Sequence, residues 1–354
     1  MLEPNNGQGS LPHIDCVIIG VNAAATLERC LTSIQSCSYP QDRLHIYYVD
    51  GGSTDASLAI ARRMAGIPTL ALNPEFPTPG LGRNAGWRAG DSPLIQFLDS
   101  DTILHPDWLK RGIMALSADY AAVKGNRCEI YPERSVYNWI ASLEWNGPAG
   151  DAECFGGDVL VRREVLVATG GYDEALVGGE DPELSRRIRL AGGQILQLDT
   201  DMTMHDLAMT GVRQYWKRAY RSGYAFAAVI DRFAQEKNPF WGKEFRRILV
   251  RGGGSLGLLG LALILGVATP ISLGTVLGLA VLGLGLLLFP RIFRVEYFRC
   301  DKHISHAQAR TYAWHCSLVV IPDICGVARY YFGKALNRPL RNRRNRLATA
   351  TLTS

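Results

Sequence analysis

The apolar positions in the first hundred residues alternate between short continuous runs and a helical spacing. Four runs have the length and content of buried strands, namely Ile14–Gly20, Leu44–Asp50, 69–73 and 93–99. Between them, apolar side chains recur every three or four residues, which predicts helices that include 27–34, 56–64 and 83–88. This alternation predicts βαβ units and a doubly wound, mostly parallel α/β sheet. Such sheets bind ligands beyond the carboxyl ends of their strands.

The pattern becomes less regular after residue 108. It predicts a helix over 108–116, a strand over 121–128 and a basic, aromatic amphipathic stretch over 215–233. A further helix is expected over 182–190, with Asp181 as its N-cap and Pro182 at its first position. No internal repeat is visible in the sequence.

Residues 252–290 contain no charged side chain. One helix over these 39 residues would be about 58 Å long, whereas the apolar core of a bilayer is about 30 Å thick. Two helices of about 18–20 residues that turn near Pro270 fit better, which predicts a membrane hairpin. The flanking arginines are Arg246, Arg247, Arg251, Arg291 and Arg294. Positive charge at both ends predicts that both ends lie in the cytoplasm. The alternative is a buried hairpin in the core of a large soluble protein.

The chain is therefore expected to divide into four parts. Residues 1–235 form a front domain that carries the chemistry, 236–251 a basic linker, 252–290 the transmembrane hairpin and 291–354 a basic, partly amphipathic C-terminal region. In the last part, residues 312–332 are expected at the membrane surface rather than across it, and the basic tail 338–346 is expected to contact anionic lipid. The N-terminus lacks a basic segment followed by an apolar core, so no signal peptide is expected.

Composition and charge narrow the function classes. The chain has 354 residues, of which 47% are hydrophobic and 20% charged, which excludes a disordered or fibrous protein. After Pro290 there are 12 Lys and Arg against 3 Asp and Glu, whereas residues 1–235 carry 28 acidic and 21 basic side chains. A mildly acidic front domain is not expected to bind nucleic acid. The 8 cysteines show no paired spacing, which indicates reduced thiols in a cytosol-facing protein.

Two acidic motifs directly follow predicted strands. In "VDGGSTD", Asp50 can accept a hydrogen bond from a nucleotide base, and the two glycines let the backbone approach a flat ligand. In "FLDSDT", Asp99 and Asp101 offer hard oxygen ligands two residues apart, which suits Mg²⁺ or Mn²⁺ carrying a diphosphate. Asp101 is the expected metal ligand, and Asp99 is expected on the metal or on a ribose. The bland alternative for both motifs is an ordinary turn.

Further polar residues gather later in the chain. In "GGEDPEL", Glu180 and Asp181 stand at a helix start, where the helix dipole would keep Asp181 ionised as a general base. His205 is a candidate third metal ligand, although a lone histidine is as often structural. Arg218 and Arg221 can stabilise a departing diphosphate, and lipid headgroups are an equal alternative for this basic stretch.

Four ordered blocks resemble those of family 2 glycosyltransferases with the GT-A fold. They are "CVIIGVNAAATLERCLTSI", "VDGGSTDAS", "GRNAGWRAG…PLIQFLDSDTILHPDWL" and "GGYDEALVGGEDPELSRRIRLAGG", and the resemblance covers roughly residues 14–221. It implies an inverting transfer of a sugar from a nucleotide-diphosphate sugar, with a divalent cation. By the motif, Asp50 would contact the base, Asp99 and Asp101 would form the DxD pair, and Asp181 would be the base. Asn22 and Arg83 would lie beside the donor.

The sequence also departs from the family. The first block reads "VIIGVNA" in place of the usual proline, aromatic residue and asparagine, and the Q-x-x-R-W motif of processive synthases is not kept after Gln214. A single hairpin is too few spans for a polymer channel, so addition of one sugar is favoured. The segment "GLGRNAG" is not a dinucleotide fingerprint, because it precedes the fourth strand rather than following the first.

Together these features predict a multi-pass enzyme of the cell (inner) membrane with its front domain in the cytoplasm. Its partners would be a nucleotide-sugar donor, a glycan or lipid-linked acceptor and membrane lipid, and its cofactor Mg²⁺ or Mn²⁺. Two rivals remain: a membrane-bound oxidoreductase that uses a dinucleotide, and a non-catalytic scaffold with a degenerate transferase domain.

Overall fold

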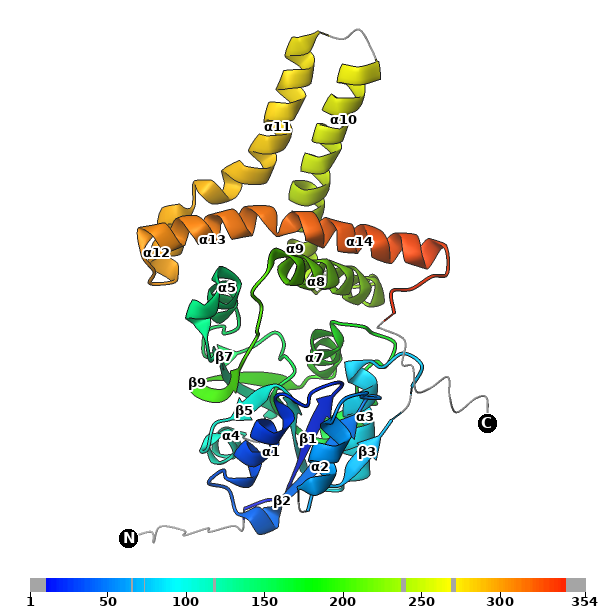
Figure 1. Ribbon diagram of the computed structural model, residues 1–354, viewed down its shortest axis with the longest axis vertical. Coiled ribbons are helices and arrows are strands. Elements are labelled where there is room, and N and C mark those ends of the chain that lie inside the picture. Colours follow the sequence, from blue (N-terminus) through cyan, green and yellow to red (C-terminus); the bar gives the residue numbers. More distant parts are fainter. Residues whose placement is uncertain are drawn as a thin grey trace.

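The computed structural model describes residues 11–64, 66–72, 74–116, 119–236, 240–268 and 272–341. Figure 1 shows the front domain at one end, a layer of helices across its top and a helical hairpin that projects from the far side of that layer. The α/β domain and the apolar hairpin predicted from the sequence are thus spatially separate parts of the structure, with the helical layer between them.

The front domain is built on one mixed sheet. Its parallel half consists of β3 (Thr69–Ala71), β2 (Leu44–Asp50), β1 (Ile14–Gly20) and β4 (Leu94–Asp99), in this spatial order. The order continues through β8 (Val159–Arg162), β6 (Tyr120–Glu129), β9 (Gln194–His205) and β5 (Thr102–Leu104), and β7 (Gly150–Asp151) pairs with β9. Strand β8 is antiparallel to both neighbours, whereas β6 and β9 are parallel. The predicted doubly wound, mostly parallel α/β sheet is confirmed.

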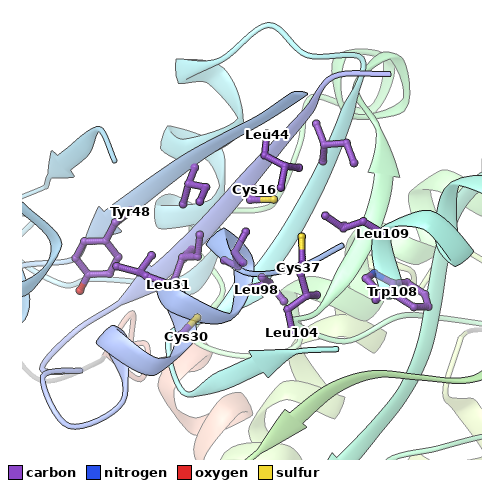
Figure 2. Packing of buried hydrophobic residues seen from close by; sticks show 14 of the residues in the cluster. Cys16, Cys30, Leu31, Cys37, Leu44, Tyr48, Leu98, Leu104, Trp108 and Leu109 are labelled. Carbon is purple, nitrogen blue, oxygen red and sulfur yellow. The ribbon is translucent and has the colours of Figure 1, made fainter. Parts of the chain in front are cut away.

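Helices cover both faces of this sheet. They are α1 (Leu27–Gln35), α2 (Ser57–Arg63), α3 (Pro79–Ala89), α4 (Trp108–Ala115), α5 (Val136–Glu144), α6 (Arg163–Thr169) and α7 (Glu180–Leu190), with short helical turns η1 (Gln41–Arg43) and η2 (Pro132–Arg134). Along β1, Cys16 and Ile18 pack into one apolar cluster, and Val17 packs into another. Figure 2 shows the first cluster, which joins α1 and Trp108 to the sheet. Burial on both faces explains why β1 is a continuous apolar run.

Several predicted boundaries differ from the structure, most by one to three residues, and the differences at α3, α7 and β3 bear on the site. Helix α3 begins at Pro79 rather than at residue 83, because Thr78 caps it by accepting a hydrogen bond from the Leu81 amide at 3.2 Å. Asp181 is not an N-cap: Gly179, with φ of 87°, precedes the helix, and Asp181 lies in its first turn. Strand β3 ends at Ala71, and residue 73 lies outside the described residues.

A layer of long helices lies over the front domain. It contains α8 (Val212–Arg232), α12 (Val295–Asp301), α13 (His306–Leu318) and α14 (Val320–Ala335). Helices α8 and α14 touch through glycines: a Cβ on Gly223 would lie 2.0 Å from the Asp323 carbonyl oxygen, and one on Gly326 would lie 2.0 Å from the Tyr220 carbonyl oxygen. Backbone contact this close fixes α8 on α14.

The hairpin rises from this layer. Helix α9 (Gly242–Arg247), the π-helical turn η3 (Ile248–Gly253) and α10 (Gly254–Ala268) follow one another, and α11 (Leu273–Ile292) returns beside α10. The continuous helix Gly242–Ala268 is long and apolar enough to cross a membrane, and so is His306–Ala335, while Leu273–Phe289 is a shorter apolar helix. The predicted turn at Pro270 lies outside the described residues.

The hairpin surface does not fit a buried core hairpin. Large apolar side chains on both helices remain exposed, such as Val267 at 82% and Val281 at 69%. Exposed apolar area on this scale favours a lipid environment. The predicted surface segment 312–332 falls within α13 and α14, which run across the hairpin axis in Figure 1. Of the predicted basic tail, only residues 338–341 are described.

Candidate active site

A cavity of about 650 Å³ lies where the carboxyl ends of β1, β2 and β4 meet. Its lining includes the loop after β1 with Asn22, the Gly51–Gly52 backbone after β2, the start of α3, and Asp99 and Asp101 after β4. Arg221 of α8 contributes from the helical layer. The place is the one expected for ligand binding in such a sheet.

Asp50 fixes the loop after β2 that lines this cavity. Its carboxylate is fully buried and accepts hydrogen bonds from the amides of Gly52 at 2.9 Å and Ser53 at 2.8 Å. The Tyr48 hydroxyl donates to the same carboxylate, and burial, followed by the charge of Asp50, raises the Tyr48 pKa, so this hydroxyl keeps its proton. The backbone of Gly51 and Gly52, rather than the Asp50 carboxylate, therefore lines the cavity. The Asp50 carboxylate holds this backbone in place, and its predicted contact with a base stays a prediction.

Asn22 connects the first two loops. Its backbone is left-handed, with φ of 55°, which asparagine tolerates better than most residues. The side-chain oxygen accepts a hydrogen bond from the Thr54 amide at 2.8 Å, and the Asn22 amide donates to the Ser53 hydroxyl at 2.8 Å. Asn22 lines the cavity as predicted, and its contact with a donor stays a prediction.

Arg83 is the centre of the polar network. Its side chain is 3% exposed and donates to Glu180 Oε1 at 2.7 Å and to Asp99 Oδ1 at 2.9 Å. The Asp181 carboxylate lies 3.4 Å from the same guanidinium. Both terminal nitrogens of Arg83 donate to carboxylates inside the protein, and its predicted place beside the donor stays a prediction. Arg83 thus joins the "FLDSDT" and "GGEDPEL" motifs.

The Arg83 contacts also separate Glu180 from Asp181. Glu180 is 5% exposed and holds Arg83, so it is a positioning residue rather than a second base. Asp181 Oδ1 is buried and has no hydrogen-bond partner among the described residues. Burial raises the pKa of Asp181 well above its ordinary value, and Arg83 opposes this only in part. The expectation that the helix dipole alone keeps Asp181 ionised is therefore wrong, because desolvation is the larger effect.

Asp99 is held by two cations. Arg127 of β6 lies 3.3 Å from its second carboxylate oxygen, and Arg83 binds the first. Burial would raise the pKa of Asp99, but these two guanidinium groups outweigh it and hold the pKa below its ordinary value. Asp99 therefore stays ionised, with its oxygens occupied by arginines rather than free for a metal ion.

Two residues of this network were missed in the sequence. Arg127 donates to Asp158 at 2.6 Å, and Asp158 also accepts from the Asp99 amide at 3.1 Å and from the Thr203 hydroxyl at 2.7 Å. Asp158 is 2% exposed. Its signal was present, because it follows two glycines and directly precedes β8, as Asp50 and Asp99 end their own strands.

Asp101 and His205 form the candidate metal site. Strand β5 pairs with β9, which brings His205 Nε2 within 3.0 Å of Asp101 Oδ2. His205 Nδ1 is buried without a partner among the described residues, and the ring packs edge-on against Trp145. Asp101 is 43% exposed at the cavity. A carboxylate oxygen and an imidazole nitrogen at this spacing are a donor set that fits Mn²⁺ or Mg²⁺.

The two predicted arginines of α8 relate to this site in different ways. Arg221 lines the cavity. Desolvation and then the charge of Arg127 lower the pKa of Arg218, while Glu144 and Asp101 act against them, so Arg218 lies near the Asp101 side. Both predicted residues are thus beside the cavity or its rim, and their contact with a diphosphate stays a prediction.

Comparison with known proteins shows what the fold and part of the sequence are similar to. Residues 15–157 match the family described as Glycosyl transferase family 2. The mannosyltransferase PcManGT from Pyrobaculum calidifontis, solved with GDP-Man and Mn²⁺, has the same fold, with a TM-score of 0.58 and 18% identity over 86% of this chain and 87% of that one. Residues 15–157 are thus similar to family 2 glycosyltransferases, and the front domain has the GT-A fold.

Two relatives show how far the similarity extends. Glycosyltransferase AglE of Haloferax volcanii is 26% identical over 192 residues, 52% of this chain and 63% of its own length. The pre-mycofactocin glycosyltransferase of Mycobacterium tuberculosis is 25% identical over 360 residues, 93% of this chain and 67% of its own length. The chain thus spans about two thirds of the length of these relatives, and the second similarity extends beyond the front domain.

Proposed function

We propose that this protein transfers one sugar from a nucleotide-diphosphate sugar to an acceptor hydroxyl, with inversion at the anomeric carbon. The observation that carries the proposal is the junction at Arg83. It links Asp99, which lines the cavity, to Asp181, whose buried Oδ1 lies 3.4 Å from Arg83 but accepts no hydrogen bond among the described residues. A leaving-group site and a proton acceptor are therefore held in one rigid network.

Asp181 acts as the general base in this scheme. Its buried carboxylate has a raised pKa, which makes it a stronger proton acceptor once ionised. It accepts the proton of the acceptor hydroxyl as the oxygen attacks the sugar. Arg221, with Arg218 at the rim, stabilises the negative charge that develops on the departing diphosphate.

Asp101 and His205 would hold the divalent cation, Mg²⁺ or Mn²⁺. When bound, the cation supplies positive charge to the diphosphate. The fit rests on the 3.0 Å approach of the two ligand atoms and on the exposure of Asp101 at the cavity, while His205 is buried behind it. Asp99 supports this site through Arg83 and Arg127 rather than as a ligand.

The proposal also covers the membrane, with a front domain up to residue 235, a linker up to 251, a transmembrane hairpin up to 290 and a C-terminal region after it. We place the α10–α11 hairpin across the cell membrane and the front domain in the cytoplasm, because arginines flank both ends of the apolar block. Helices α13 and α14 would lie at the membrane surface. A lipid-linked or glycan acceptor would then approach the cavity along α8, the helix that carries Arg221 and packs on α14.

The test is metal-dependent donor binding by the full chain. Calorimetry with UDP- and GDP-sugars, with Mn²⁺ or with chelator, should show binding only with metal, and Asp101→Ala should abolish it. Asp42→Ala is the control, since Asp42 is 79% exposed and does not line the cavity. Unchanged binding by Asp101→Ala would refute the metal assignment. Binding of NAD(H) in place of nucleotide-sugars would favour an oxidoreductase, and hydrolysis or transfer of sugar excludes a scaffold.

A further inference from the structure

Three arginines gather at the base of the hairpin. Arg251 of η3 is 6% exposed and donates to the carbonyl oxygen of Leu287 on α11 at 2.7 Å and to that of Cys316 on α13 at 3.2 Å. It therefore fixes the start of the first hairpin helix against the end of the second. This contact determines where the neighbouring arginines lie.

Arg247 and Arg291 each lie about one helical turn from the Arg251–Leu287 contact, toward the base of the hairpin. Arg247 precedes Arg251 by four residues, and Arg291 follows Leu287 by four, so each lies about one helical turn further toward the base. Because α10 and α11 run in opposite directions, both displacements point the same way along the hairpin. The charges of all three arginines act on one another, which confirms that they lie close together.

No carboxylate forms a salt bridge with this cluster among the described residues. The Nε atoms of Arg247 and Arg251 are buried without an acceptor there. Asp323 of α14 is 3% exposed and feels the charge of Arg247, but burial outweighs that charge and raises the pKa of Asp323 to about 7, so it offsets the arginines only in part. Unpaired donors on buried cations are costly unless an anion accepts from them.

A nearby group of possible metal ligands does not change this conclusion. Ligand atoms of Glu144, His315 and Cys316 lie within 4.8 Å of one another. However, both ring nitrogens of His315 are already paired, with the Tyr215 hydroxyl at 2.9 Å and with Glu144 at 3.2 Å. The adjacent arginines would also repel a cation, so the surroundings favour an anion.

We propose that Arg247, Arg251 and Arg291 form a binding site for the phosphate group of an anionic membrane lipid. The proposal rests on insertion of the hairpin, because insertion places the base of the hairpin at the depth of the headgroups. Phosphate oxygens accept several charge-assisted hydrogen bonds at once, which suits converging guanidinium groups. The site is separate from the donor cavity, whose described lining includes none of these residues.

The test uses the full chain in a neutral detergent, titrated with phosphatidylglycerol or phosphatidylcholine and measured by native mass spectrometry. Arg251 is left intact because it holds two helices together. The double variant Arg247→Gln/Arg291→Gln should weaken phosphatidylglycerol binding about tenfold and leave phosphatidylcholine binding unchanged. Arg291→Lys, which keeps the charge, should retain part of the binding. Arg310→Gln, an exposed position on α13, removes the same kind of charge elsewhere in the layer.

Each outcome decides the proposal. Selective loss in the double variant, with Arg310→Gln unchanged, supports it. Equal loss in Arg310→Gln means that binding is diffuse and overturns it. If millimolar inorganic phosphate displaces the lipid, the arginines bind a soluble anion rather than a lipid headgroup, and the proposal is overturned. Lipid binding is measured without donor, so a chain that selects the anionic lipid but transfers no sugar would refute the proposed function alone.

Discussion

Arg83 and Asp99 form a 2.9 Å salt bridge in which the arginine side chain is 3% exposed. The same guanidinium donates to Glu180 and lies beside Asp181, so one cation from α3 joins strand β4 to the start of α7. This relationship makes the position of the proposed base depend on the residue that supports the proposed metal site.

Arg83→Met should destabilise the fold by about 3–5 kcal/mol, because it leaves buried carboxylates without their cation. The loss should depend on pH. Asp99 has a lowered pKa in the folded protein, so its contribution is present above its unfolded pKa of about 4 and is lost as the pH falls through the folded pKa. Chemical denaturation of wild type and variant should therefore differ most near neutral pH and converge in acid.

The control for this prediction is Arg88→Met. Arg88 is on the same helix but is 51% exposed, and its salt bridge is to Glu174 at the surface, so its removal should cost less than about 1 kcal/mol. Equal losses for the two variants would mean that the buried network does not stabilise the domain.

Gly157→Ala should impair transfer while the domain stays folded. A Cβ at this position would lie 2.5 Å from Asp99 Oδ2 and 2.7 Å from Arg83 Nη2, so the network must shift. We expect at least a tenfold lower kcat/KM, because small displacements in a site are costly. The neighbouring Gly156→Ala is the matched control, since its Cβ would meet nothing within 4 Å. Full activity in Gly157→Ala would show that the Arg83–Asp99 geometry is not needed.

The sequence predicted the strands better than the network. β1 and β2 have their predicted bounds, because an apolar run buried on both faces has few other structures available. Asp101 reaches the cavity because the ends of parallel strands converge at one edge. Helix α3 was expected to start four residues late, because "PTPGLG" combines poor helix formers. Its start depends on a cap from Thr78 and on Pro79 at the first position.

The long-range contacts could not be read from spacing. Arg83 meets Glu180 across 97 positions of the sequence, and only the packed fold determines that both are buried. Nothing in the motif around Arg83 indicates that its partners are carboxylates inside the protein, so the sequence suggested only a place beside the donor. Arg127 lies in a strand whose acidic residue, Glu129, is not its partner, and its role follows from the pairing of β6 with β8, which brings it to Asp158.

Asp181→Asn should abolish transfer, by about a hundredfold or more, and keep donor binding. In the wild type, kcat should fall as the pH drops through the raised pKa of Asp181, because the base becomes protonated.

The Asp181→Asn variant should also be more stable than the wild type at about pH 8. A raised folded pKa means that stability is fully present below the unfolded pKa of about 4 and is lost as the pH rises through the folded one. Melting curves at several pH values, with activity assays, check both parts. If Asp181→Asn is less stable than the wild type at pH 8, the buried Asp181 carboxylate does not destabilise the fold, which would contradict its raised pKa.

Gly326→Ala should uncouple the helical layer from the cavity. A Cβ here would lie 2.0 Å from the Tyr220 carbonyl oxygen and 2.6 Å from the Tyr224 amide, and backbone atoms within α8 cannot move aside singly. The two helices must separate, at a cost of about 1–3 kcal/mol. Because Arg221 lies on α8 and lines the cavity, the donor KM should rise several-fold while Asp181 and its network stay intact. Gly278→Ala on α11 is the matched control, since its Cβ would meet nothing within 4 Å. A lower melting temperature with an unchanged donor KM would show that α8 does not transmit the position of the membrane layer to the donor site.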